Sequence, residues 1–366
     1  MRLIIAGLLF LMALPAFVFS QDVAATSAEN WRNPNSVRVE EAEKAFTAEW
    51  IGKTKNESIF VWVYREGGPI FLFSLFHIDT FLLNRWGMYA LVIDPEGNAH
   101  WITHTPKKKS VSFSEEFLSI TDGATTFEGE DGSYRLEARF GDLEGTIDIS
   151  NRLPAWKPGT GRLDYNEEGS LYQKRILVSP WADAKGTISI SGDTFEIEGH
   201  GYVSKTRFAN PLTRFAPYIH SLKLYSDEQF IYLLDVTLND SYDNEIVPML
   251  IVAEDDEWLF TTQDYTYEIL ETVKVEGLPY EYPQRIRLMA EDSGYFLDGV
   301  YSEERLLNVT DVFNEIPAIV RRTLTLLISR PIYFRAAGGF VGTLTHPDGT
   351  ITQLDLAGPY EYTVVR

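Results

Sequence analysis

Three carboxylates in this sequence have neighbours of the kind that acid catalysis requires. Asp183 follows Trp181, Glu198 follows Ile197, and Asp235 follows two leucines. A carboxyl group buried among apolar side chains has a raised pKa, because desolvation disfavours its charged form, and it could then protonate an alkene or an enol. The alternating pattern around these residues favours instead the polar side of a strand, so Asp183 and Glu198 are only weak catalytic candidates.

Histidines and cysteines give little support for a metal site. The chain has 6 His and no Cys. His100 and His104 are four residues apart, which suits metal ligation on a helix, but their surroundings predict a strand. On a strand the two rings would be separated by about 13 Å along the chain. We therefore expect no metal.

Charge and motifs exclude several classes of function. The 53 acidic residues outnumber the 32 basic ones, the net charge is -21, and the one basic run is Lys107 to Lys109. Nucleic acid is bound by clusters of Lys and Arg, so we expect no nucleic-acid partner. The sequence has no Gly-rich phosphate loop, no Gly-x-Ser-x-Gly elbow and no His-Glu-x-x-His motif. It thus gives no reason to expect a cofactor, and it offers no support for the motif-defined nucleotide enzymes, α/β-hydrolases or zincins.

The elements that must position any site are predicted to be strands. Aromatic residues reach 13%, and short runs bounded by turn residues follow one another from about Phe46. Apolar and polar residues alternate on both sides of Gly192-Asp193, which predicts a half-buried hairpin. Two further hairpins are predicted over residues 89–104 and 340–356, around turns that contain Pro and Gly. This pattern is typical of antiparallel sheets.

One segment has a helical period. Apolar residues from Ile316 to Ile328 recur at intervals of three and four, with Asn314 before them and Pro331 after them. The pattern predicts an amphipathic helix that flanks or plugs a barrel. The alternative is a helix in peripheral contact with a membrane.

The first residues predict export. Arg2 is followed by an apolar stretch to Phe19, and Val18 and Ser20 suit a cleavage site before Gln21. Residues 1–20 therefore resemble a secretory signal peptide, which predicts a periplasmic or extracellular protein; an uncleaved membrane anchor is the alternative. Residues 21–45 predict a flexible leader. In a eukaryotic pathway the sequons could be glycosylated at Asn56, Asn239 and Asn308.

Several segments together resemble a known family. They are 180–188, with the sequence PWADAKGTI, 199–203, with GHGYV, and 209–211, with ANP. Residues 94–97, 315–320 and 330–333, together with Phe340, extend the resemblance over most of the chain. In this order they are similar to the survival factor family, which is related to exported hydratase-like proteins and to carotenoid 1,2-hydratases.

The resemblance implies a mostly β fold of two tandem lipocalin-like (calycin) antiparallel barrels or sandwiches. We place these domains at residues 46–200 and 201–366, with the boundary near Gly199 to Gly201. The family members handle ceramide-type lipids or terpenoids, which implies a hydrophobic small molecule here. Antiparallel barrels of about eight strands can enclose one such ligand. Candidate ligand-binding residues near the central motif are Trp181, Tyr202, Arg207, Tyr218 and His220.

Three functions remain open at this point. The first is an exported carrier that binds a lipid or an isoprenoid-like molecule and needs no catalytic residue. The second is a hydratase- or cyclase-like enzyme, of the hydro-lyase or isomerase type, in which a buried acid acts on a polyene or terpenoid. The third is a structural protein whose barrels are filled by their own side chains. The missing catalytic motifs favour the carrier, and the sequence leaves the oligomeric state open.

Overall fold

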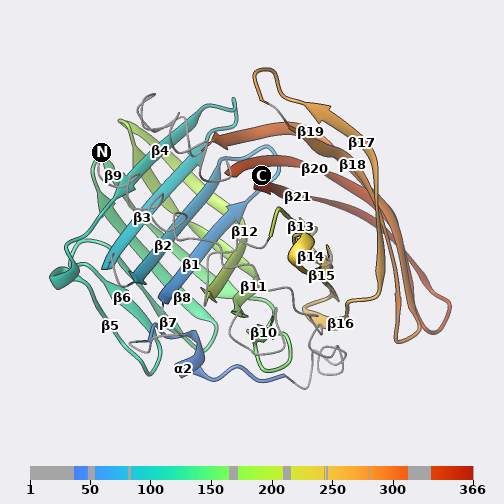
Figure 1. Ribbon diagram of the computed structural model, residues 1–366, viewed down its shortest axis with the longest axis horizontal. Helices are drawn as coiled ribbons and strands as arrows, with labels where there is room; N and C mark the ends of the chain where they lie inside the picture. The colour runs from blue at the N-terminus through green and yellow to red at the C-terminus, as the bar shows by residue number, and fades with distance from the viewer. Residues whose placement is uncertain are drawn as a thin grey trace. The chain divides into compact units, whose positions relative to one another are not determined.

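The chain folds into two compact units. A computed structural model describes residues 37–47, 54–80, 84–164, 172–208, 216–242, 244, 246–278, 280–311 and 331–365. Of these, residues up to 208 belong to an N-terminal unit and residues from 216 onward to a C-terminal unit. Figure 1 shows that both units consist almost wholly of β-strands. The predicted mostly β, antiparallel class is thus confirmed.

The N-terminal unit contains a 12-stranded antiparallel sheet. Its strand order is β4-β3-β2-β1-β12-β11-β9-β8-β7-β6-β5, and β10 pairs with β11 beside this path. Two short helical segments accompany it, α2 (Glu41–Lys44) and the 3-10 turn η3 (Lys108–Ser110). The strands are β1 (Thr54–Tyr64), β2 (Ile70–Thr80), β3 (Asn84–Ile93), β4 (Ala99–His104), β5 (Ser112–Phe113), β6 (Leu118–Thr121), β7 (Thr126–Glu130), β8 (Ser133–Phe140), β9 (Leu143–Asn151), β10 (Arg162–Asp164), β11 (Tyr172–Ile190) and β12 (Asp193–Phe208).

The C-terminal unit contains a 9-stranded antiparallel sheet of order β16-β15-β14-β13-β21-β20-β19-β18-β17. The 3-10 turn η5 (Asp240–Tyr242) follows its second strand. The strands are β13 (Tyr218–Tyr225), β14 (Gln229–Thr237), β15 (Ile246–Glu254), β16 (Glu257–Thr262), β17 (Tyr265–Lys274), β18 (Glu281–Asp292), β19 (Tyr295–Asp311), β20 (Pro331–Thr345) and β21 (Ile351–Val365).

Both sheets share one topology. In each unit four strands meander to one edge, the chain crosses to the opposite edge, and the remaining strands meander back. The last strand then pairs with the first, β12 with β1 and β21 with β13. Sequence-local hairpins therefore build two half-sheets, and one long-range pairing joins them.

Several hairpins turn through two residues with positive φ. Ser191 and Gly192 have φ angles of 57° and 91°, and Asp131 and Gly132 have 50° and 79°. Two-residue turns with positive φ at both positions match the right-handed twist of the flanking strands. The hairpin predicted around residue 192 is confirmed, as are those over 89–104 and 340–356.

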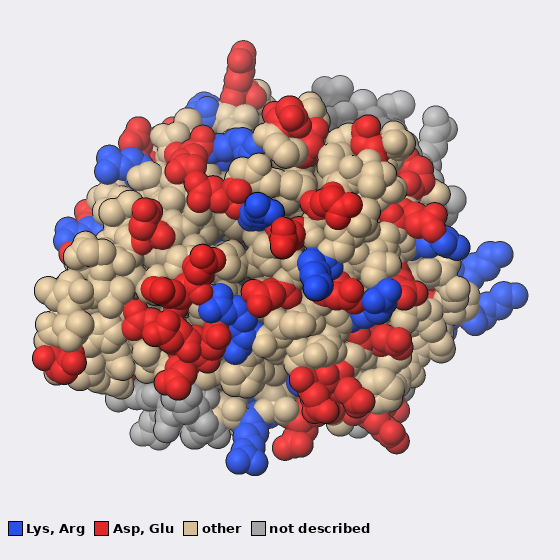
Figure 2. Space-filling view, turned by 180° about the vertical axis from the view of Figure 1, so that it is seen from behind, with Lys and Arg blue, Asp and Glu red and all other residues tan. Residues whose placement is uncertain are grey.

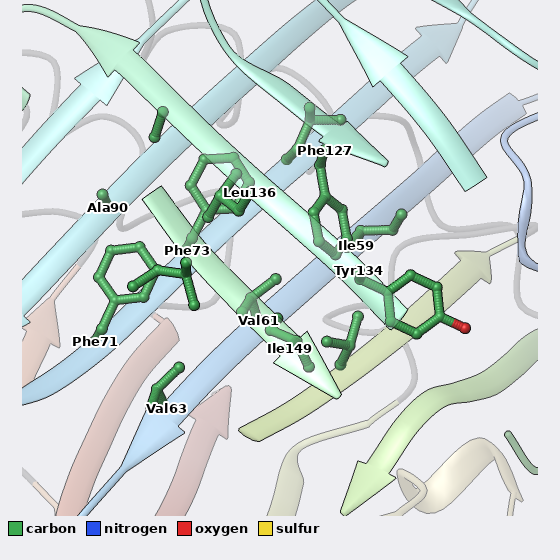
Figure 3. Close-up of a cluster of buried hydrophobic side chains, with 14 of the residues drawn as sticks. Ile59, Val61, Val63, Phe71, Phe73, Ala90, Phe127, Tyr134, Leu136 and Ile149 are labelled. Atoms are coloured by element: carbon green, nitrogen blue, oxygen red, sulfur yellow. The ribbon is translucent and has the colours of Figure 1, made fainter. Parts of the chain in front are cut away.

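The sheet of the N-terminal unit curves around an apolar interior. Figure 3 shows side chains of β1 and β2, such as Val61 and Phe73, together with Leu136 of β8 and Ile149 of β9. The rings of Phe73 and Phe140 lie 6.5 Å apart although four strands separate β2 from β8 in the sheet. Burial alternates along β8, where every second residue is exposed. The interior is therefore lined by every second side chain of such strands, whose other side chains face solvent.

Four expectations concern the leader, the signal peptide, the predicted helix and the domain boundary. The predicted leader over residues 21–45 is ordered in its last part, because α2 lies there and Lys44 and Ala45 are buried. Its earlier part, the signal peptide and the helix predicted over residues 316–328 lie outside the described residues. The boundary placed between residues 200 and 201 falls inside β12, which continues to Phe208. Among the described helices none combines the length and apolar character that crossing a membrane requires.

We predict that Gly186→Ala destabilises the N-terminal unit. A Cβ atom on Gly186 would collide with the carbonyl oxygen of Thr146 on the neighbouring strand, where backbone cannot easily move. Such overpacking typically lowers the free energy of unfolding by about 1–3 kcal/mol. Denaturant unfolding measures the change. Gly68→Ala is the control, since its added methyl would meet only the side chain of Arg65, and equal stabilities of the two variants would contradict the prediction.

Candidate functional site

A buried histidine and a buried carboxyl group face each other inside the C-terminal unit. His220 of β13 is directly opposite Asp235 of β14, and on its other side it is opposite Tyr362 of β21. Directly opposed residues of antiparallel strands point to the same face. His220 is two residues from Leu222, and Asp235 is two from Leu233, and both leucines belong to the apolar core. The two polar side chains therefore point into the interior.

Tyrosines from a distant strand complete this cluster. The Tyr267 hydroxyl of β17 lies 2.8 Å from His220 Nδ1, and the Tyr360 hydroxyl lies 2.8 Å from the same nitrogen. The two hydroxyl oxygens are 3.2 Å apart. Tyr360 lies on β21, next to β13, whereas four strands separate β17 from β13 in the sheet, so the Tyr267 contact exists only because the sheet curves back on itself. The ring of Tyr362 lies 4.6 Å from the imidazole. We call these four residues, with Asp235 and Tyr265, the interior polar cluster.

The carboxyl group of Asp235 has one tyrosine partner in this cluster. The Tyr265 hydroxyl donates a hydrogen bond to Asp235 Oδ1. Asp235 is 5% exposed, and no cation forms an ion pair with it among the described residues. Tyr265 and Tyr267 are two residues apart on β17 and point to the same side of that strand. One strand thus provides a hydroxyl to the carboxyl group and another to the imidazole.

Burial decides the charge state of both ionisable groups. Desolvation raises the pKa of Asp235 from 3.8 to about 6, and the hydrogen bond from Tyr265 opposes part of this rise. Desolvation lowers the pKa of His220 from 6.5 to about 3. Burial also raises the pKa of Tyr267 and of Tyr360. Near neutral pH the imidazole and the phenols are therefore uncharged, and Asp235 ionises within the mildly acidic range.

This arrangement can do two kinds of chemistry. Neutral hydroxyl and imidazole groups in an aromatic interior can orient a polar atom of an otherwise apolar guest. A carboxyl group with a pKa near 6 can also donate a proton at mildly acidic pH. Clusters of shifted pKa values inside an apolar interior are more frequent at functional sites than elsewhere.

Trp181 and Tyr202, which we expected to bind a ligand, lie on the other face of the N-terminal sheet. Both are buried, but neither belongs to the interior core. Tyr202 is opposite Trp62 of β1, and the guanidinium of Arg152 lies 3.8 Å above the ring of Trp181. Trp181 Nε1 donates to His200 Nδ1 at 3.4 Å. They form a second buried layer of this unit.

Both weak catalytic candidates are in contact with solvent. Asp183 is exposed on β11, opposite His200. The Glu198 side chain is 71% exposed and pairs with Arg65 at 3.0 Å. Neither is therefore buried among apolar side chains, as the acid-catalysis hypothesis requires.

The remaining candidates divide between the units. Arg207 is 9% exposed and lies 3.9 Å from Glu57 Oε1 at one end of the N-terminal interior. Tyr218 packs against the C-terminal core with its ring stacked on Tyr362, centroids 6.2 Å apart. Of the five residues proposed from the sequence, only His220 belongs to the interior polar cluster, and Tyr218 borders it.

Sequence reasoning left all four tyrosines of this cluster unnoticed. Tyr265 and Tyr267 are spaced by two residues, and so are Tyr360 and Tyr362. This spacing signals that each pair faces one side of a strand. It does not reveal that β17 lies across from β13 and β14. Asp235 was noticed as a carboxylate, but the pattern favoured a position in solvent for it.

Among the described residues, no three imidazole or carboxylate groups converge as a metal ion would require. The interior polar cluster itself offers one imidazole and one carboxylate. The chemistry of this cluster therefore depends on those two groups and the phenols.

Two curved up-and-down β units with a polar cluster in one interior define a class of tandem β-meander proteins. Residues 94–331 match the model of the Svf1 family, and the chain belongs to that family. No curated protein sequence matches the chain.

Solved structures share this fold. The chain is similar to an AttH protein from Nitrosomonas europaea, with a TM-score of 0.60, 12% identity and coverage of 90% of this chain and 98% of that one. CghA in complex with Sch210972 gives a TM-score of 0.61 at 9% identity, covering 86% and 89%. Kievitone hydratase from Nectria haematococca gives 0.51 at 13% identity, covering 94% and 96%. Identities this low support the shared fold alone.

We predict that Asp235→Asn changes how stability depends on pH. The folded protein binds the Asp235 proton up to about pH 6, whereas the unfolded chain loses it near 3.8. The Asp235 contribution to stability is therefore fully present below pH 3.8 and is lost as pH rises to about 6. The variant should gain up to about 3 kcal/mol over the natural chain across this window. Urea unfolding at pH 4, 5, 6 and 7 measures this difference, and a difference that is constant with pH would contradict the prediction.

Proposed function

We propose that this protein is an exported carrier that binds a hydrophobic small molecule, a lipid or an isoprenoid-like compound, inside its C-terminal unit. The observation that carries the proposal is the interior polar cluster. Burying His220 and Asp235 in an apolar core is unfavourable relative to apolar side chains of the same size. Fold stability therefore does not explain why these groups are buried. Hydrogen bonds to the polar atom of a ligand would explain it.

The surroundings of the cluster suit an apolar body. Aromatic rings of Tyr301, Phe334 and Tyr362 line the same interior, and a lipocalin-like barrel holds its guest mainly by apolar area. CghA, of the same fold, was crystallised with the small molecule Sch210972. This supports the idea that the architecture can accommodate a guest.

The proposed carrier is exported and does not bind nucleic acid. Residues 1–20 have the pattern of a signal peptide, so we place the mature protein in the periplasm or the extracellular medium. Asp and Glu side chains are spread in patches over the face seen in Figure 2, with basic residues scattered among them. Such a surface disfavours nucleic acid. Contact with a membrane through residues 316–328 stays a prediction.

The first experiment is native mass spectrometry of the protein purified from the envelope of its host. We expect a chain that begins at Gln21 and carries one apolar molecule, which lipid extraction would then identify. A chain that retains residues 1–20 would contradict export. An empty chain that also fails to bind the uncharged fluorophore Nile red would contradict the carrier and favour a structural protein with filled barrels.

We predict that Tyr267→Phe weakens binding of Nile red about tenfold, because the variant removes a hydroxyl donor without removing a ring. Fluorescence titration measures the affinity. The control is Tyr225→Phe, which alters a buried tyrosine of β13 that lies outside the interior core. If the two variants bound Nile red with equal affinity, the interior polar cluster would not be part of the ligand site.

A second candidate function is acid-catalysed hydration of a terpenoid alkene, favoured by the raised pKa of Asp235. The Asp235 carboxyl would give its proton to one alkene carbon, and water would add to the other carbon. The added water then returns one proton to the carboxylate, so alkene and water yield an alcohol and the acid is restored. The similarity to kievitone hydratase extends to the fold and leaves the reaction as a proposal.

We predict for this candidate that Asp235→Asn abolishes hydration of squalene, used as a test alkene, since an amide cannot supply the proton. Mass spectrometry of extracted products detects the addition of one water. Asp183→Asn, which replaces an exposed carboxylate, is the control and should keep full activity. No hydrated product from the natural chain, or undiminished product from Asp235→Asn, would eliminate this candidate.

A further inference from the structure

The N-terminal unit has a cavity of its own. Its volume is about 640 Å³, which lies within the usual range for small-molecule sites. Apolar side chains form part of its wall, and charged and polar ones form the rest. The lining residues are Ala42, Glu43, Ala45, Phe46, Thr47, Glu115, Thr160, Gly161, Lys174, Ile176, Lys205 and Arg207. The cavity is therefore amphipathic.

Residues 42–47 form one wall, and this wall is firmly held. The Phe46 ring is fully buried, with the rings of Trp86 and Phe113 at 5.5 and 6.2 Å. Lys205 Nζ donates to the carbonyl oxygens of Glu43, at 2.8 Å, and Ala45. Aromatic packing and hydrogen bonds from a buried ammonium fix this segment across the end of the sheet, so the cavity is a formed feature.

The opposite wall carries a group of positive charges. Lys174 of β11 is directly opposite Arg207 of β12, and Lys205 lies two residues before Arg207 on the same face. One buried carboxylate is shared between two of them, since Glu57 Oε1 lies 3.1 Å from Lys205 Nζ and 3.9 Å from Arg207 Nε. Two of these three cations therefore share one buried anion, and the third is opposite Arg207 in the ladder.

Two other described carboxylates line the cavity. Glu43 is engaged by Lys157, whose Nζ lies 2.6 Å from Glu43 Oε2. Glu115 is exposed to water, which screens its charge. Burial chiefly lowers the pKa of Lys205, and the charges of Arg207 and Lys174 lower it further, whereas Glu57 raises it. The three cations thus repel one another, and an anion placed among them would relieve that repulsion.

We propose that this cavity binds a small anionic amphiphile of the fatty-acid type, with its carboxylate toward Lys174 and Arg207 and its apolar body against Ala42 and Ile176. The guanidinium fork of Arg207 suits a carboxylate, and the ammonium of Lys174 adds a second charge. The chain carries a net charge of -21, so this group of cations is unusual for it. The site is in the N-terminal unit, has different chemistry from the interior polar cluster, and goes beyond the proposed function.

Calorimetric titration of the full chain with three probes tests the proposal. Dodecanoate carries both charge and apolar body, 1-dodecanol carries only the body, and acetate carries only the charge. We expect one dodecanoate per chain, bound at least about tenfold more tightly than either other probe and more weakly as salt is raised. Dodecanol or acetate binding as tightly as dodecanoate would overturn the proposal.

Variants locate the binding. Lys174 is exposed and its replacement leaves the buried ion pair of Glu57 and Lys205 intact, so Lys174→Gln should fold normally. It should weaken dodecanoate binding about tenfold and leave dodecanol unchanged. Arg65→Gln, which removes an exposed cation of the same unit, should have no effect. Loss of dodecanoate binding in Tyr267→Phe but not in Lys174→Gln would place the ligand in the C-terminal unit and overturn the proposal.

Discussion

The pairing of the first strand with the last in each unit is the constraint on which the rest of this structure depends. Every other ladder joins strands that are near in sequence, whereas β1 with β12 and β13 with β21 join the two ends of a unit. Closing such long loops costs chain entropy that local hairpins do not pay. Burial of apolar side chains offsets this entropic cost. Side chains such as Phe73 and Phe140 come into contact only when both half-sheets curve around one interior.

The same curvature creates the candidate site. Tyr265 and Tyr267 stand at the edge strand β17, yet their hydroxyls reach Asp235 and His220 across the interior. A low dielectric then acts on both ionisable groups in opposite directions, raising the pKa of the acid and lowering that of the base. At mildly acidic pH a protonated carboxyl group and a neutral imidazole are thereby held in one interior, where they can orient or protonate an apolar guest.

The two units use buried polar groups differently. In the N-terminal unit Lys205 and Glu57 remain a close ion pair, and the ammonium also bonds to backbone carbonyls that fix residues 42–47. In the C-terminal interior burial keeps the imidazole neutral and shifts the ionisation of Asp235 to about pH 6, and both groups bond to phenols. Two copies of one topology therefore present a positively charged cavity and a polar cluster without a cation among its described residues, and distinct ligand chemistries follow from that difference.

The sequence by itself determined the local structure. Alternating polarity and turn residues such as Gly192 predicted three hairpins and the mostly β class, because these signals involve neighbours in the chain. Family resemblance placed His220 among the candidates. The same alternation placed Asp183 and Glu198 on the polar side of their strands, and both are exposed. Tertiary structure alone decided that Asp235, for which the pattern favoured the same position, is buried and bonded to Tyr265. The physical reason is that the two-residue period of a strand shows only which side chains share a face. The curvature of the whole sheet decides whether that face is in contact with water, with another layer or with a closed interior.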